Sequence, residues 1–90
     1  MPKISNKTAR GFVQTRAPFT GNNTFAEVRN GIFVVFSCGD HFPLFAFVNG
    51  VWFENEDKYS PTTSKHRSQL HPLTETQKLS TKALQSVYSN

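Results

Sequence analysis

Apolar residues concentrate in one stretch of this chain, residues 30–54, and the segments on both sides are polar. Two Asn-Gly pairs, Asn30-Gly31 and Asn49-Gly50, lie at the start of this stretch and near its end. An Asn-Gly pair supplies the two positive φ angles of a type I′ turn and is the strongest short-range signal for a β-hairpin. The pattern therefore predicts two successive hairpins, which form an antiparallel meander of about four strands.

The first turn determines which residues face each other in the first hairpin. The pairs run from Arg29 opposite Ile32 to Phe25 opposite Phe36. Directly paired residues share one face of the sheet, so one face is wholly apolar and carries Ala26, Val28, Phe33 and Val35. The reverse face carries the charges of Glu27 and Arg29, which predicts an edge strand.

The second turn places Val48 opposite Val51 and Phe45 opposite Glu54. One face then carries Leu44, Ala46, Val48, Val51 and Phe53, and we expect it to face the core. The other face carries an aromatic stripe made of Phe45, Phe47 and Trp52. Either the C-terminal helix or a second subunit covers this stripe, or it is an exposed face that binds a protein partner.

Two helices are expected after the meander. Ser60 and Pro61 are typical of an N-cap and a first helical position, so a short polar helix is predicted from Pro61 to about Leu70. Ser80 is expected to cap a second helix, Thr81–Tyr88, whose apolar edge suits packing across a sheet.

The first twenty residues show neither the helical nor the strand period. Residues 1–20 are therefore predicted to form an irregular basic N-terminal arm, from which Phe12, Val13 and Phe19 dock on the sheet. Residues 21–90 are expected to form a single small α+β domain: the meander, the short polar helix and the C-terminal helix packed on the sheet.

The net charge of +4 is unevenly distributed along the chain. Residues 1–20 and 58–90 are basic, whereas residues 21–57 are acidic. Basic arms on an acidic core are typical of proteins that bind nucleic acid or an acidic protein surface. The charge pattern therefore predicts that the two basic ends of the chain contact the partner.

Composition narrows the class of protein. The single Cys38 excludes an internal disulfide and suits a reducing cytosol. The N-terminus has no apolar segment typical of a signal peptide, and the longest apolar run is too short to span a bilayer. We therefore expect a cytoplasmic protein without a membrane partner, and so small a core with a surplus aromatic face also favours a homodimer.

Residues 58–69, KYSPTTSKHRSQ, are the best candidate for a binding segment. They are rich in hydrogen-bond donors and contain no acid, as a phosphate backbone requires. The alternative is a solvated polar helix and loop. The candidate nucleic-acid contacts are Lys58, Tyr59, Thr62, Thr63, Ser64, Lys65, His66, Arg67 and Gln69, together with Arg10 and Arg16 of the N-terminal arm.

A resemblance appears in the same region. HFPLFAF at 41–47 and VWFENEDKYSPTTSKHRSQ at 51–69 resemble small uncharacterised proteins encoded by bacteriophages and other mobile elements. The similarity covers roughly residues 32–69 and implies a phage or mobile-element origin and, if so, the host cytoplasm. It implies no particular activity. This chain departs from the pattern where the group often has Tyr, at Phe33, Phe36, Phe45 and Phe53.

Catalysis and metal binding are not predicted. Ser64 and Ser68 flank His66 closely, but no carboxylate stands at a spacing that would orient the histidine, and there is no glycine-rich phosphate loop. A zinc site from Cys38, His41, His66 and His71 is conceivable, but these spacings match no standard pair of ligands. We therefore expect no enzyme, no metal and no cofactor.

Two hypotheses of function remain. The first is an accessory protein that binds DNA or RNA through the basic arms and residues 58–69. The second is an inhibitor or adaptor that binds a host enzyme or defence complex through the aromatic stripe, Phe45, Phe47 and Trp52.

Overall fold

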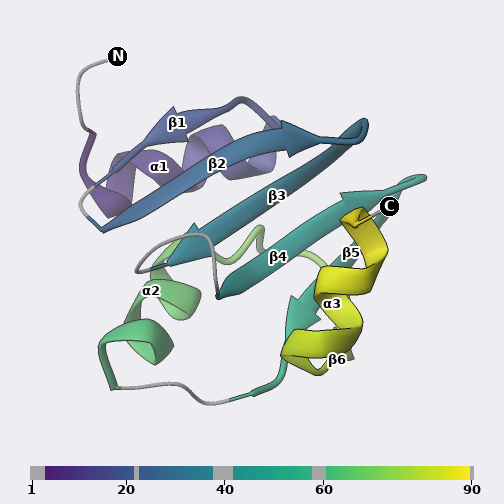
Figure 1. Cartoon of the computed structure of the whole chain (residues 1–90). Helices are drawn as coiled ribbons and strands as arrows, with labels where there is room; N and C mark the ends of the chain where they lie inside the picture. The colour runs from purple at the N-terminus through teal and green to yellow at the C-terminus, as the bar shows by residue number, and fades with distance from the viewer. Residues whose placement is uncertain (1–3, 22, 38–41, 58–60, 90) are drawn as a thin grey trace.

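The computed structural model (Figure 1) describes residues 4–21, 23–37, 42–57 and 61–89, without the side chains of residues 6, 7 and 61–63. The fold is α+β, with three helices and one six-stranded mixed sheet in the order β1-β2-β3-β4-β5-β6. The elements are α1 (Asn6–Gln14), β1 (Phe19–Thr20), β2 (Thr24–Arg29), β3 (Ile32–Ser37), β4 (Pro43–Val48), β5 (Val51–Asn55), α2 (Pro61–Leu70), β6 (Thr76–Leu79) and α3 (Thr81–Tyr88). The expected class is confirmed, with six strands instead of about four.

Both predicted hairpins are present in the predicted register. Asn30 and Gly31 have φ angles of 53° and 79°, and Asn49 and Gly50 have 50° and 82°, as type I′ turns require. Arg29 pairs with Ile32 at the first turn, and the register of the second hairpin also agrees with the prediction. β2 is not an edge along its whole length, because the short β1 pairs with its first half.

The pairing of β3 with β4 contains one irregularity. Val35 pairs with Phe45 but Phe36 pairs with Pro43, so Leu44 is an extra residue on β4. A bulge breaks the alternation of side chains along a strand. Leu44 therefore packs in the same cluster as Phe45, whereas simple alternation predicted that it would share a face with Ala46.

Two hydrophobic clusters cover opposite faces of the sheet. The larger cluster joins α1 and α2 to the face that carries Phe33, Val35 and Phe45. The smaller cluster joins α3, through Leu84 and Tyr88, to the other face. Figure 1 shows α3 in front of the sheet and α1 behind it. The C-terminal helix thus packs on the sheet as predicted.

The prediction of an irregular structure for residues 1–20 is wrong for Asn6–Gln14, which form α1. Ser5 caps α1 by accepting a hydrogen bond from the backbone N–H of Thr8, and Ala9 and Val13, four residues apart, are fully buried. The helix is short and mostly polar, and Gly11 in its middle disfavours a helix, so the sequence did not predict it. The expected docking of Phe12, Val13 and Phe19 is confirmed: Val13 and Phe19 are buried in the larger cluster, and Phe12 packs against it.

β6 was not predicted from the sequence. Its four residues, TQKL, are mostly polar, and Gln77 and Lys78 are exposed. β6 pairs in parallel with β5, and parallel neighbours need a crossover connection, which α2 provides. No helix in the described part of the chain is long and apolar enough to cross a membrane.

Candidate functional site

Helices α1 and α2 lie side by side on one face of the sheet and are joined by polar contacts. Arg10 Nη2 donates a hydrogen bond to the carbonyl oxygen of Ser68 (2.5 Å), and Gln14 Nε2 donates to that of Pro72 (3.4 Å). The last carbonyl groups of a helix have no partner within the helix, so Arg10 satisfies one of them at the end of α2. We refer to these two helices as the α1–α2 layer.

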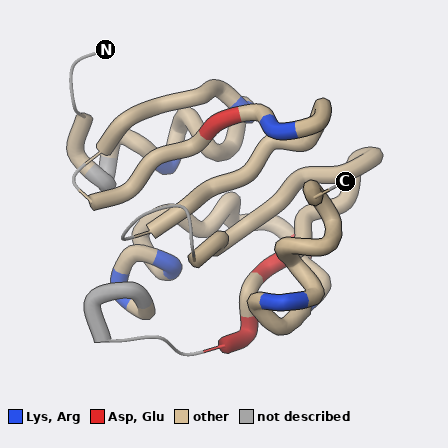
Figure 2. Tube along the Cα trace, in the orientation of Figure 1, with Lys and Arg blue, Asp and Glu red and all other residues tan. Residues whose placement is uncertain are grey.

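The α1–α2 layer contains no acidic residue. It carries Lys7 and Arg10 in α1 and Lys65 and Arg67 in α2, and Arg16 follows α1 directly. Figure 2 shows basic and no acidic positions on the described parts of the two helices. Tertiary packing therefore brings Arg10 of α1 next to the end of α2, the helix that carries Lys65 and Arg67.

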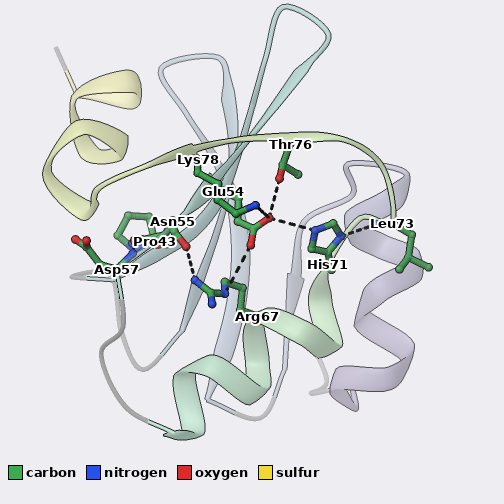
Figure 3. Close-up of polar contacts among 9 residues, drawn as sticks. All are labelled: Pro43, Glu54, Asn55, Asp57, Arg67, His71, Leu73, Thr76 and Lys78. Carbon is green, nitrogen blue, oxygen red and sulfur yellow. Dashed lines mark hydrogen bonds and ion pairs between the residues drawn. The ribbon is translucent and has the colours of Figure 1, made fainter.

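Arg67 nevertheless makes internal contacts that limit its availability to a ligand. Its Nη1 donates to the carbonyl oxygen of Asn55 (2.6 Å), and its Nε lies 3.7 Å from Oε2 of Glu54 (Figure 3). The Glu54 side chain is only 8% exposed. A buried carboxylate is costly unless it is paired, so Arg67 helps to keep Glu54 in the interior.

Three further groups surround the same carboxylate. Thr76 Oγ1 donates to Glu54 Oε1 (2.7 Å), His71 Nε2 lies 3.2 Å from that oxygen, and Lys78 Nζ lies 3.9 Å from it. His71 Nδ1 accepts a hydrogen bond from the backbone N–H of Leu73 (2.9 Å). This places the proton of neutral His71 on Nε2, where it is donated to Glu54. We call Glu54, Arg67, His71, Thr76 and Lys78 the Glu54 cluster; it joins β5, α2 and β6 (Figure 3).

A second polar group fixes the segment between β5 and α3. The fully buried Asn55 donates to the carbonyl oxygen of Pro43 (2.7 Å) and to Thr81 Oγ1 (2.9 Å). Asp57 Oδ2 accepts from the backbone N–H of Thr81 (2.8 Å). Hydrogen bonds from Thr81 lower the pKa of Asp57, because they favour the charged carboxylate.

His66 is part of the core and does not face a ligand. Its side chain is buried, and Nδ1 shares a hydrogen bond of 2.7 Å with Oγ of the buried Ser37. Burial lowers the pKa of His66, and the positive charge of Lys65 lowers it further. The buried position of His66 does not support the prediction that it contacts phosphates, because α2 turns this residue toward β3.

The other predicted contacts differ in accessibility. Lys65 and Arg16 are exposed, and the guanidinium carbon of Arg16 lies 4.8 Å from the ring centroid of Phe47. Ser64 and Gln69 are half-buried. Lys58 and Tyr59 lie outside the described residues, as do the side chains of Thr62 and Thr63.

The aromatic stripe is not an exposed face. Phe45 is fully buried, Trp52 is 6% exposed and Phe47 is half-buried. The α1–α2 layer covers the stripe, whereas we expected the C-terminal helix or a second subunit to do so. Phe45 and Trp52 are therefore core residues and do not form the exposed face that the protein-binding alternative requires.

A search of the described residues finds no group of three or more His, Cys, Asp or Glu side chains that could hold a metal ion. Of the four residues considered for zinc, Cys38 and His41 lie outside the described ranges. His66 and His71 have different partners, Ser37 and Glu54 respectively.

Comparisons of this chain with protein-family models, with curated proteins and with solved structures found no match. The function of this chain is therefore inferred from its geometry and charge.

Proposed function

We propose that this chain is a small non-enzymatic accessory protein, of the kind encoded by phages and mobile elements, that binds nucleic acid through the α1–α2 layer. The observation that supports the proposal is the side-by-side packing of two helices that carry four basic residues and no acid. A basic surface without interspersed acids attracts the phosphate backbone. The phage origin is supported by the sequence resemblance alone.

Within the layer, basic residues have two different roles. Lys65 and Arg16 are exposed and would contact phosphates directly. Arg10 and Arg67 donate to backbone carbonyl groups within the protein, so they add positive potential but are held in place by the fold. Binding should therefore depend most on the exposed pair.

Replacement of Lys65 by Ala tests this proposal. Each phosphate contact that is lost should reduce the slope of log affinity against log salt concentration by about 1. We therefore expect K65A and R16A each to lower this slope for labelled single-stranded and double-stranded oligonucleotides, measured by fluorescence anisotropy at several salt concentrations.

Lys82 provides the matched control, because it is an exposed lysine on α3, against the opposite face of the sheet. K82A removes the same charge and should leave the slope unchanged. Equal slopes for wild type, K65A and R16A would contradict the proposal. An equal decrease in K65A and K82A would show that net charge, not the α1–α2 layer, controls binding.

A further inference from the structure

A hollow of about 350 Å³ opens where β5 and β6 begin. Residues 50–52 of the second hairpin form one side, and residues 74–77, which lead into β6, form the other. This volume is within the range of sites that hold small molecules. The hollow does not include the cations of the α1–α2 layer, so it is a separate site.

Trp52 lines this hollow and carries an indole N–H donor. The residue is 6% exposed, and its indole N–H donates to no group in the described part of the chain. The indole nitrogen is not among the fully buried polar atoms that have no partner, so it is accessible to solvent. A buried tryptophan N–H usually finds a partner, and the hollow that Trp52 lines is where a partner could reach it.

The other lining groups add acceptors. The hydroxyl hydrogen of Thr76 is donated to Glu54, so Thr76 Oγ1 can only accept a hydrogen bond from a ligand in the hollow. Glu75 contributes a carboxylate, which also only accepts. The hollow thus offers a ligand one donor and two acceptors. A ligand that matches them is a planar ring with an amino group next to an acceptor atom, as in cytosine, adenine and guanine.

The hollow lies close to the exposed Arg16. The Arg16 guanidinium is 4.8 Å from the centroid of the Phe47 ring, and that ring is 5.0 Å from the Trp52 ring. A strand whose phosphate contacts Arg16 can thus place a base at the hollow.

We infer that the hollow binds one unstacked base of a single-stranded nucleic acid, and that it prefers a base with an exocyclic amino group. The inference rests on the proposed function, because the strand is held by the α1–α2 layer. Thymine is disfavoured, because its single donor lies between two carbonyl groups that the Glu75 carboxylate would repel. Base recognition from single strands by hydrogen bonds to the base edge is a general mode of binding.

Two homopolymers of equal length, oligo-dC and oligo-dT, test this inference. Trp52 is the only tryptophan of the chain, so its fluorescence reports on the hollow directly. We expect oligo-dC to bind about tenfold more tightly than oligo-dT in an anisotropy titration, consistent with one base-specific contact. We also expect oligo-dC, but not oligo-dT, to change the tryptophan fluorescence.

Glu75→Gln supplies the decisive variant, because an amide can both donate and accept and should remove most of the preference for oligo-dC. Glu56→Gln is the control; it makes the same change at an exposed residue that does not line the hollow, and it should keep the preference. Binding of both homopolymers with equal affinity and unchanged fluorescence would overturn the base site alone. Failure of both homopolymers and of duplex DNA to bind would overturn the proposed function as well.

Discussion

Glu54 is the residue on which most polar contacts between β5, α2 and β6 converge. Its nearly buried carboxylate contacts a hydroxyl, a histidine and an arginine, and Lys78 lies at the edge of the group. The sequence shows Glu54 only as a charge at the end of an apolar strand. Its role depends on partners that follow it by 13 to 24 positions in the chain.

Glu54→Gln should destabilise the fold strongly. The variant keeps the volume of the side chain but replaces the anion that Arg67 and His71 contact by a neutral amide, and loss of a hydrogen bond to a charged group costs about 1.5–3 kcal/mol. Urea unfolding followed by circular dichroism would measure the change. Glu56→Gln, at an exposed position two residues later, should change the unfolding free energy by less than about 0.5 kcal/mol. Similar values for the two variants would contradict the role of the Glu54 cluster.

His66 predicts a pH dependence of stability. Its pKa in the folded protein lies below the ordinary value of 6.5, so the unfolded chain binds a proton at a pH where the folded protein does not. The contribution of neutral His66 is therefore fully present above about pH 6.5 and is lost progressively as the pH falls below that value. Unfolding free energies measured between about pH 8 and pH 5 should decrease toward the acid side. The decrease should be smaller in His66→Gln, and an equal decrease in both proteins would refute this assignment.

Among the elements, α3 shows how local and distant residues combine at one helix end. Ser80 Oγ accepts a hydrogen bond from the backbone N–H of Ala83 (3.2 Å), as the sequence predicted. Asp57, which precedes α3 by more than twenty residues, accepts from Thr81 (2.8 Å). The start of α3 is thus capped by Ser80, which is next to it in the sequence, and by Asp57, which only the folding of the chain brings there.

Ser80→Ala should cost about 1 kcal/mol, because it removes the local cap and leaves the N–H of Ala83 without its partner. Thermal and urea unfolding would give this value. Ser86→Ala on the exposed side of the same helix is the matched control, and it should be neutral or slightly stabilising, because Ala is the better helix former. A loss in Ser86→Ala as large as that in Ser80→Ala would exclude capping as the cause.

On the scale of the whole molecule, the sheet is covered on both faces by different helices. The larger cluster depends on α1, because Ala9 and Val13 are fully buried against the face that carries Phe33 and Phe45. Without α1, these rings would be exposed to solvent. Helix α1 is therefore needed to complete the core.

Val13→Ala tests the contribution of α1 to the core. Loss of two buried methyl groups should cost about 2 kcal/mol in unfolding free energy. Val28→Ala, the same change at a side chain that is 55% exposed on β2, should cost less than about 1 kcal/mol. Denaturant unfolding would measure both values. An unchanged unfolding free energy in Val13→Ala would contradict a contribution of α1 to the core.

The sequence by itself predicted the turns and helix starts, which depend on residues close together in the chain. The two Asn-Gly turns determine the hairpin registers through their own positive φ angles, and Ser80 marks the start of α3 through a hydrogen bond to a residue three positions away. The helix Pro61–Leu70 was predicted in the same way, from Ser60 and Pro61, but the sequence did not separate the exposed Lys65 from the buried His66.

The face that each helix covers was decided only by the tertiary structure. The α1–α2 layer buries Phe45 and Trp52, the polar strand β6 gains its stability from β5, and Arg67 and His71 meet Glu54 through the crossover between these strands. These contacts join residues far apart in the chain, and no short pattern encodes them. Their formation depends on the total surface buried when the elements pack together, which is a property of the whole fold and not of any one segment.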